Sequence, residues 1–232
     1  FAGGASYYLP LVFPREEPRL RPFLTLRHSD PPSFSAWRDA FLWFMQKVTY
    51  RDSITRPLPG GRKGSPRPLL IKSPVHVGRM HLWLKMFPQA RYIYIHRNPV
   101  EVFQSAAHMA DTYYWYTYLQ SPSHEELTQF ILRQYEILFS EYTQYKDAVP
   151  DQHLIQVSFE ELEADPLGTL RKIYDRFGWS SRFEAMVPRF TAYCKEGLKD
   201  FKRNQHNRLS PEMEACVRHR WGDSFKMFGY SC

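Results

Sequence analysis

Two cations stand directly before residue pairs that typically open a helix, and both positions suit the binding of an anion. Lys72 precedes Ser73-Pro74, and Arg97 precedes Asn98-Pro99. Ser or Asn followed by Pro marks a helix N-terminus, where free backbone N–H groups and the helix dipole attract negative charge. Each pair is also compatible with a solvated cation beside an ordinary helix cap. Two such pairs in consecutive units favour a shared anion site.

Other polar side chains near these cations could complete a phosphate site or accept a proton. Ser105 follows Arg97 by eight residues, and a guanidinium with a hydroxyl suits phosphate. Helical spacing places His108 on the same face as Ser105, and His76 lies one turn after Lys72. Either histidine is a candidate general base, with a structural role as the alternative for each.

Alternating short apolar runs and longer amphipathic stretches predict the elements that position these residues. We expect strands over 69–72, 91–96 and 153–157. Helices should begin near Ser35, Pro74, Asn98, Ser123, Ser158, Asp165 and Ser210. This order indicates an α/β fold with a mainly parallel sheet, in which ligands bind beyond the carboxyl ends of the strands. We place the domain at 35–232, after an irregular arm at 1–34 that is rich in Pro, Gly and Arg.

Composition and charge narrow the class of partner. The chain has 232 residues, a net charge of +7 and 43% hydrophobic residues, which suits one globular domain with an anionic partner. It contains no tight Lys/Arg run or nucleic-acid motif, and no apolar run approaching the ~18 residues of a membrane span. We therefore expect neither a nucleic-acid partner nor a transmembrane segment.

The cysteines bear on metal binding and on the compartment. Cys194, Cys216 and Cys232 are too few and too widely spaced for a disulfide framework or a zinc site, so we expect no metal. Free thiols favour a reducing compartment, either cytoplasmic or organelle-soluble. A secretory lumen stays open as an alternative if an N-terminal anchor precedes residue 1.

Four stretches together resemble the pattern of sulfotransferases that use 3′-phosphoadenosine 5′-phosphosulfate (PAPS). LLIKSPVHVGR at 69–79 matches a strand end of the form K-[SD]-P, and FPQARYIYIHRNPVEVFQS at 87–105 matches an apolar strand followed by R-[DN]-P-x-x-h-x-S. LIQVSFEELEADPLGTLRKIYDRFG at 154–178 resembles the family's third strand and following helix. The tail from LKDFKRNQHNRLSPE at 198–212 to FGY resembles the broad bacterial and algal group. The likeness covers roughly 35–232.

The resemblance implies a three-layer fold like that of P-loop nucleoside triphosphatases and an activity of EC 2.8.2 type. Arg97 and Ser105 look like the pair that binds the 3′-phosphate. Lys72 looks like the lysine that contacts the transferring sulfuryl group or the bridging oxygen. Phe159 stands where the family has an aromatic residue near the adenine. The pair Lys202-Arg203 is similar in position to residues that add positive charge near a phosphate.

The family's first strand normally leads into a loop, P-x-S-G-T-T, that wraps the 5′-phosphosulfate, and no such sequence is present. FAGGAS at 1–6 has glycines but no preceding strand and no Ser/Thr pair after them. Either the loop lies upstream of residue 1, or the protein has lost it. The first case predicts an enzyme that moves a sulfuryl group from PAPS to a hydroxyl or amine acceptor and releases 3′-phosphoadenosine 5′-phosphate (PAP). The second predicts a catalytically inactive, sulfotransferase-like structural or interaction subunit of a larger assembly.

Two further stretches are candidate contact surfaces. The aromatic run at 113–116 (YYWY) could line an acceptor pocket or meet a protein partner, and the N-terminal arm could serve as a partner surface. The basic stretch GGRKG at 60–64 lacks a phosphate-loop pattern and is expected to be a solvated connector. On its own, the chain is expected to bind PAPS poorly because the 5′-phosphosulfate loop is missing from it.

Overall fold

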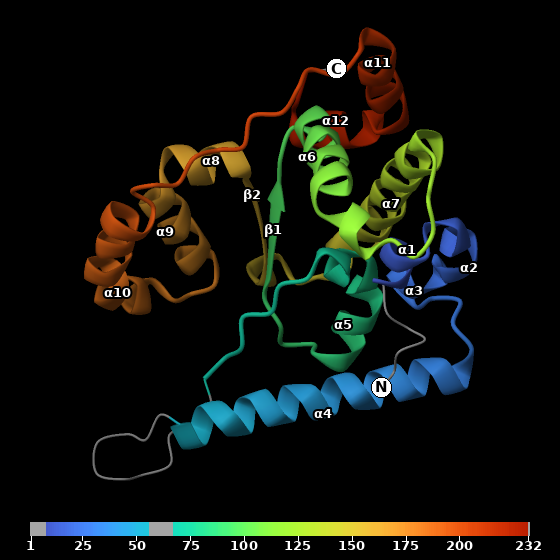
Figure 1. The fold of residues 1–232 in the computed structure, drawn as a ribbon. Coiled ribbons are helices and arrows are strands. Elements are labelled where there is room, and N and C mark those ends of the chain that lie inside the picture. The colour runs from blue at the N-terminus through green and yellow to red at the C-terminus, as the bar shows by residue number, and fades with distance from the viewer. Residues whose placement is uncertain (1–7, 56–66, 232) are drawn as a thin grey trace.

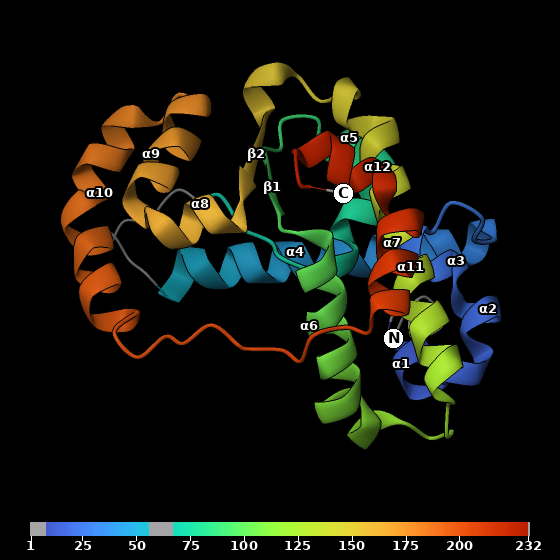
Figure 2. The ribbon, with the colours of Figure 1, turned by 90° about the horizontal axis from the view of Figure 1, so that it is seen from above.

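The protein places most of its helices to either side of two parallel strands, as the computed structural model shows for residues 8–55 and 67–231 (Figure 1). Strand β1 (Tyr92–His96) pairs with β2 (Leu154–Ser158), and the register joins Tyr92 to Leu154 and His96 to Ser158. The predicted strands at 91–96 and 153–157 and their parallel pairing are therefore confirmed. Helices α8, α9 and α10 lie on one side of the strands, whereas α6, α7 and α11 lie on the other (Figures 1 and 2).

The predicted strand at 69–72 is wrong. Residues 67–73 run as extended coil, and the side chain of Leu70 is 90% exposed. A strand forms only where a neighbour satisfies its backbone N–H and C=O groups, and the sheet of the described residues consists of β1 and β2 alone. An apolar run without such a neighbour stays outside the sheet. The three-layer arrangement implied by the resemblance accordingly remains a prediction.

The helices begin close to the predicted positions. The N-terminal part contains α1 (Leu9–Val12), η2 (Pro14–Glu16), α2 (Glu17–Leu20), α3 (Pro22–Thr25) and the long α4 (Pro31–Thr55). The middle contains η3 (Pro74–Arg79), α5 (Met80–Met86), α6 (Pro99–Thr112), η4 (Tyr114–Thr117), α7 (His124–Tyr145), η5 (Lys146–Ala148) and η6 (Asp151–His153). The last part contains α8 (Phe159–Ala164), α9 (Pro166–Arg176), α10 (Ser180–Ala192), η7 (Tyr193–Gly197), α11 (Pro211–Arg220) and α12 (Gly222–Phe228).

Most of the predicted helix caps are formed. The Asn98 side chain accepts a hydrogen bond from Val100 N, and both Ser123 and Ser158 take part in complete capping boxes. Ser73 is an exception, because its side chain makes no capping hydrogen bond and the following turn η3 is a 3-10 helix. The chain after Lys72 therefore lacks the regular α-helical N-terminus that the Ser-Pro pair predicted.

The described part of the segment predicted to be irregular, from residue 8 onward, forms short helical turns that pack on α7. Arg27 attaches these turns to α7, because its Nε and NH2 groups donate to the two carboxylate oxygens of Glu141 at 2.8 and 2.7 Å. A bidentate guanidinium–carboxylate contact of this kind fixes orientation as well as distance. The N-terminal turns therefore form one wall of the body of the protein.

The core that supports α6 gathers side chains from four helices. Its fully or almost fully buried members are Phe103, Leu132, Val217, Trp221 and Phe225. Trp221 also donates its indole N–H to the Leu132 carbonyl oxygen at 3.1 Å. This cluster locks α6 against α7, α11 and α12, and so fixes the residues that α6 carries. None of the described helices is long and apolar enough to traverse a lipid bilayer.

Candidate functional site

The register of the two strands brings two predicted site residues together. His96 is the partner of Ser158, so the next residue of each strand, Arg97 or Phe159, leaves the same end of the sheet. The guanidinium carbon of Arg97 lies 4.6 Å from the centre of the Phe159 ring. A guanidinium at this distance from an aromatic face gains a cation–π attraction. The structure therefore brings Arg97 and Phe159 together, whereas their roles toward a phosphate and an adenine remain predictions.

Glu101 joins Arg97 to the predicted residue Arg203. Its Oε2 atom accepts a hydrogen bond from Arg97 Nε at 2.7 Å and another from Arg203 NH2. Arg203 also approaches Glu163 at 3.3 Å, and its guanidinium carbon lies 5.8 Å from the Phe159 ring centre. Two guanidinium groups therefore flank one aromatic ring, although Arg203 is distant in sequence. We call Arg97, Glu101, Phe159 and Arg203 the strand-end cluster.

In the described structure, Arg97 has hydrogen-bond donors that are available to a ligand. Within the described part of the chain, its Nε atom is bound to Glu101 while its two terminal nitrogens have no hydrogen-bond partner. The side chain of Arg97 is 20% exposed, so these donors are partly shielded from water. Shielded guanidinium donors bind an anionic oxygen more strongly than exposed ones do.

Ser105 and His108 lie on α6, on the face that also carries Glu101. Gln104 donates its side-chain amide to the carbonyl oxygen of Asn207 at 2.9 Å, which holds the extended segment 200–210 against this helix. That segment crosses the upper end of the sheet between α10 and α11 (Figure 1). His206 from this segment stands 5.2 Å from the His108 ring, measured between centroids.

His206 belongs to the electrostatic environment of the strand-end cluster. Burial lowers its pKa, and the nearby charges of His108, Arg97 and Arg203 act in the same direction, whereas Glu101 opposes them. Sequence reasoning did not select His206, because no strand end or helix cap marks its position. Glu101 was expected only to help cap the helix after Asn98, and its link to Arg97 was missed although their four-residue spacing was an available signal.

The structure does not bring Lys72 and Lys202 into the strand-end cluster. Both side chains are exposed, Lys72 in the coil before η3 and Lys202 in the extended segment that carries Arg203. Among the described residues, neither lysine forms an ion pair with a carboxylate. Their predicted contacts with the sulfuryl group and a phosphate thus remain predictions.

His76 lies in an aromatic environment away from the strand ends. Its ring meets Trp83 edge-on at 4.9 Å between centroids, and Trp83 donates its indole N–H to the His76 carbonyl oxygen. Burial first, and then the charge of Arg79, lower the pKa of His76 to about 4. His76 is therefore neutral at pH 7, and so low a pKa makes it a weak proton acceptor.

A second hydrogen-bonded group, also missed from the sequence, joins the C-terminal tail to the strand ends. The hydroxyl of Tyr230 donates to Glu160 Oε2 at 3.0 Å and lies 2.9 Å from His96 Nδ1. Glu160 also accepts from the backbone N–H of Asn98 at 3.4 Å. This group fixes the two segments that carry Arg97 and Phe159 to each other.

Two sequence predictions lie outside the described residues. These are the glycine-containing stretch FAGGAS at 1–6 and the basic connector GGRKG at 60–64. Cys194 and Cys216 are both half-buried free thiols, and Cys232 also lies outside the described residues. In the described ranges, no group of three or more His, Cys, Asp and Glu side chains could hold a metal ion.

Comparison with known proteins assigns the chain to a family. It is 28% identical over 228 residues to the omega-hydroxy-beta-dihydromenaquinone-9 sulfotransferase Stf3 of Mycobacterium bovis, and equally to that of Mycobacterium tuberculosis. The match covers 98% of this chain and 55% of each relative, so the chain spans about half the length of these relatives. No solved structure matches it. A sequence model of the sulfotransferase family matches residues 17–184, and the chain therefore belongs to the sulfotransferase family.

Proposed function

We propose that this protein transfers a sulfuryl group from PAPS to a hydroxyl acceptor. The observation that carries the proposal is the strand-end cluster, in which Arg97 and Arg203 flank the ring of Phe159 beyond the carboxyl ends of two parallel strands. This is the part of a parallel sheet where ligands usually bind. An anionic nucleotide combines the two features that this group suits, a phosphate and a flat ring.

The residues of the cluster would divide the nucleotide between them. The free terminal nitrogens of Arg97 would bind the 3′-phosphate, with Ser105 as a second donor from α6. The half-buried ring of Phe159 would contact the adenine. Glu101 orients both guanidinium groups through one oxygen atom, so it acts as a positioning residue. Lys202, beside Arg203, would add positive charge at the rim.

PAPS supplies the sulfuryl group, which moves from a phosphate oxygen to the acceptor oxygen while PAP leaves. Negative charge develops on the departing oxygen, and a positioned ammonium such as Lys72 would stabilise it. The acceptor proton must pass to a base. We favour His108 over His76 for this role, because His108 shares the face of α6 with Ser105 whereas His76 has a pKa of about 4.

The names of the mycobacterial relatives describe an acceptor that carries an omega-hydroxy group. This favours a hydroxyl over an amine as the group that receives the sulfuryl unit here. Oxygen and nitrogen acceptors would need the same in-line placement against the donor. The choice between them depends on the acceptor pocket and not on the strand-end cluster.

Isothermal titration calorimetry with PAP tests the donor site, on this chain and on a version that includes any upstream sequence. We expect Arg97→Ala to weaken PAP binding about 10- to 100-fold, the range for a lost hydrogen bond to a charged group. Arg91→Ala is the matched control, because Arg91 precedes β1 at the opposite end and contacts Trp179 instead. Equal affinities of the two variants would contradict the proposal. PAP binding without any sulfuryl transfer would instead favour an inactive, sulfotransferase-like subunit.

A further inference from the structure

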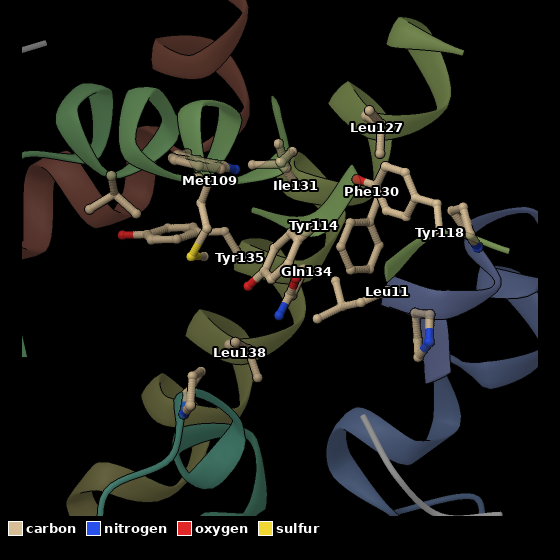
Figure 3. Close-up of a pocket in the computed structure, with 17 residues that line it drawn as sticks. Leu11, Met109, Tyr114, Tyr118, Leu127, Phe130, Ile131, Gln134, Tyr135 and Leu138 are labelled. Atoms are coloured by element: carbon tan, nitrogen blue, oxygen red, sulfur yellow. The ribbon is translucent and has the colours of Figure 1, made fainter. Parts of the chain in front are cut away.

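An elongated pocket lies between α6, α7 and the N-terminal turns, apart from the strand-end cluster. Figure 3 shows Tyr118 and Leu127 at one end and Leu138 at the other. Leu127 and Leu138 are eleven residues apart on α7, which corresponds to about 16 Å along a helix. The pocket volume is about 240 Å³. Sites for drug-sized ligands usually measure about 300–1,000 Å³, so this pocket suits a narrow segment of a longer molecule.

The lining of the pocket is mainly aliphatic and aromatic. Its apolar walls include Leu11, Val102, Ala106, Met109, Phe130 and Ile131. An apolar body entering such a space would release its ordered water and gain about 25 cal/mol for each Å² buried. A charged or sugar-like ligand would instead lose hydrogen bonds to water without replacement.

One buried polar side-chain atom of the lining has no hydrogen-bond partner in the described structure. The hydroxyl oxygen of Tyr118 is buried and has no hydrogen-bond partner in the described structure. The Tyr118 ring points inward beside Phe130 in Figure 3. Burial raises the pKa of Tyr118 to about 12, so the hydroxyl keeps its proton and can donate. A buried donor without a partner is costly, and a ligand oxygen at this point would remove that cost.

The segment after α6 closes the pocket and exposes aromatic rings around it. Leu119 N donates to the Val12 carbonyl oxygen at 2.9 Å, which ties this segment to the N-terminal turns. Tyr114 and Tyr118 line the pocket, whereas the neighbouring Tyr116 is 74% exposed, and its ring is tilted against that of Trp115 at 4.2 Å between centroids. The predicted aromatic run therefore divides into residues that line the pocket and residues that surround it.

One end of the pocket is bordered by the turn η3, which directly follows the segment with Lys72. Pro74 contributes to the lining and follows Lys72 by two residues. Leu138 packs beside Gly78 of the same turn η3. An acceptor held between Tyr118 and Pro74 would therefore present one end near the segment that carries the candidate catalytic lysine.

We infer that this pocket binds the acceptor, and that the acceptor is an elongated apolar alcohol with a second oxygen atom at its far end. The acceptor role rests on the proposed sulfuryl transfer. The second oxygen accepts a hydrogen bond from Tyr118, the apolar body fills the space along α7, and the reacting hydroxyl lies at the Pro74 end. In the transfer, the acceptor oxygen forms the new bond to sulfur, its proton passes to the base, and PAP departs with the electrons of the broken bond.

Headspace partitioning of octan-1-ol and n-nonane over the protein solution tests the pocket directly, because the two probes have similar lengths and differ in one hydroxyl. The wild-type chain should bind both and prefer the alcohol. Tyr118→Phe should weaken octan-1-ol binding about 2- to 10-fold and abolish the preference for octan-1-ol over n-nonane, since it deletes only the hydrogen-bond donor. Tyr116→Phe, the exposed neighbour, should keep the preference.

A pocket-filling pair provides the second arm. Ala106→Phe on the lining face of α6 should prevent binding of both probes, whereas Thr112→Phe at the exposed end of the same helix should not. Unchanged binding by Ala106→Phe, or an unchanged preference in Tyr118→Phe, would overturn the inference. PAP titration of Ala106→Phe separates the two proposals. If Ala106→Phe binds PAP but neither probe, both proposed sites are supported. If the wild-type chain and its longer version do not bind PAP, only the proposed donor site is contradicted.

Discussion

The strand-end cluster and the apolar pocket between α6, α7 and the N-terminal turns, which we call the Tyr118 pocket, differ in construction, although α6 contributes to both. One face of α6 carries Glu101 in the cluster, and another carries Ala106 in the pocket. In the cluster, Arg97 and Phe159 directly follow strand ends, and Glu101 comes from α6 and Arg203 from the segment 200–210. Hydrogen bonds and ring contacts fix their orientation. The pocket consists mainly of apolar side chains from several separate segments, and the buried hydroxyl of Tyr118 in its lining has no hydrogen-bond partner in the described structure.

This difference shows how one helix can separate two chemically different regions, the proposed donor site and the proposed acceptor pocket. The anionic half of a reaction needs fixed charges, and these come from the ends of secondary-structure elements where backbone geometry is well defined. The apolar half needs a shape, and shape comes from the packing of distant segments. A change in one half should therefore leave the other intact, unless it disturbs the core that holds α6.

The largest effect should come from that shared core. Phe225 is fully buried against Trp221 and the other members of the cluster that supports α6. Phe225→Ala should destabilise the protein by about 3–5 kcal/mol, because it leaves a cavity that the core fills poorly. Urea unfolding gives this value, and PAP and octan-1-ol binding should weaken together. Phe44→Ala, at a side chain 56% exposed on α4, should change the unfolding free energy by less than about 0.5 kcal/mol.

Removing one charge from the strand-end cluster should affect only the donor side. Arg203→Ala should weaken PAP binding by about 1.5–3 kcal/mol, because it removes the group that pairs with Glu101 and flanks Phe159. Lys199→Ala removes one positive charge from an exposed position four residues before Arg203, and so controls for the general effect of net charge. Titration calorimetry measures both. Similar losses in the two variants would show that net charge, and not the cluster, attracts the nucleotide.

The pH dependence of stability should reveal the neutral state of His76. An unfolded histidine gains its proton near pH 6.5, whereas His76 in the folded protein gains it only near pH 4. The contribution of neutral His76 to the free energy of unfolding is therefore complete above pH 6.5 and is lost as the pH falls from about 6.5 to 4. The unfolding free energy should therefore fall less on acidification in His76→Phe than in the wild type, by about 1–2 kcal/mol. This value allows for the partial exposure of His76. Urea unfolding at pH 7 and 4.5 checks this, with the exposed His28→Phe as the control.

The smallest expected effect concerns the tail that joins the two strand ends. Tyr230→Phe removes the hydroxyl between His96 and Glu160 and should cost about 1 kcal/mol of stability. PAP affinity should fall about 2- to 5-fold, because Glu160 loses part of its support beside Asn98. Tyr193→Phe, with an exposed ring, should do neither. A change in octan-1-ol binding in Tyr230→Phe would show that the strand-end cluster and the Tyr118 pocket are not independent.

The sequence predicted much of the local structure around the strand-end cluster. Asn98, Ser123 and Ser158 cap their helices as expected, because capping depends on residues within one turn of each other. The strands at 92–96 and 154–158 followed from short apolar runs between turn signals. The proximity of Arg97 and Phe159 then follows from parallel pairing alone, since both leave the same end of the sheet.

Other features needed the tertiary structure. The run at 69–72 has the composition of a strand but lies outside the sheet, because strand formation depends on a neighbour as well as on sequence. Glu101, His206 and Tyr230 gained their importance from partners up to 134 residues away, as in the contact of His96 with Tyr230. No local pattern specifies such partners.

The sequence by itself determined which residues end the strands, which of them carry charge and how the following helices begin. These properties arise from interactions between near neighbours in the chain. Only the tertiary structure decided that Arg203 returns to Arg97 and Phe159, and that Tyr118 faces an apolar pocket beside Leu11 and Phe130. The physical reason is that cavities and long-range ion pairs depend on how separate elements pack, which no single segment encodes.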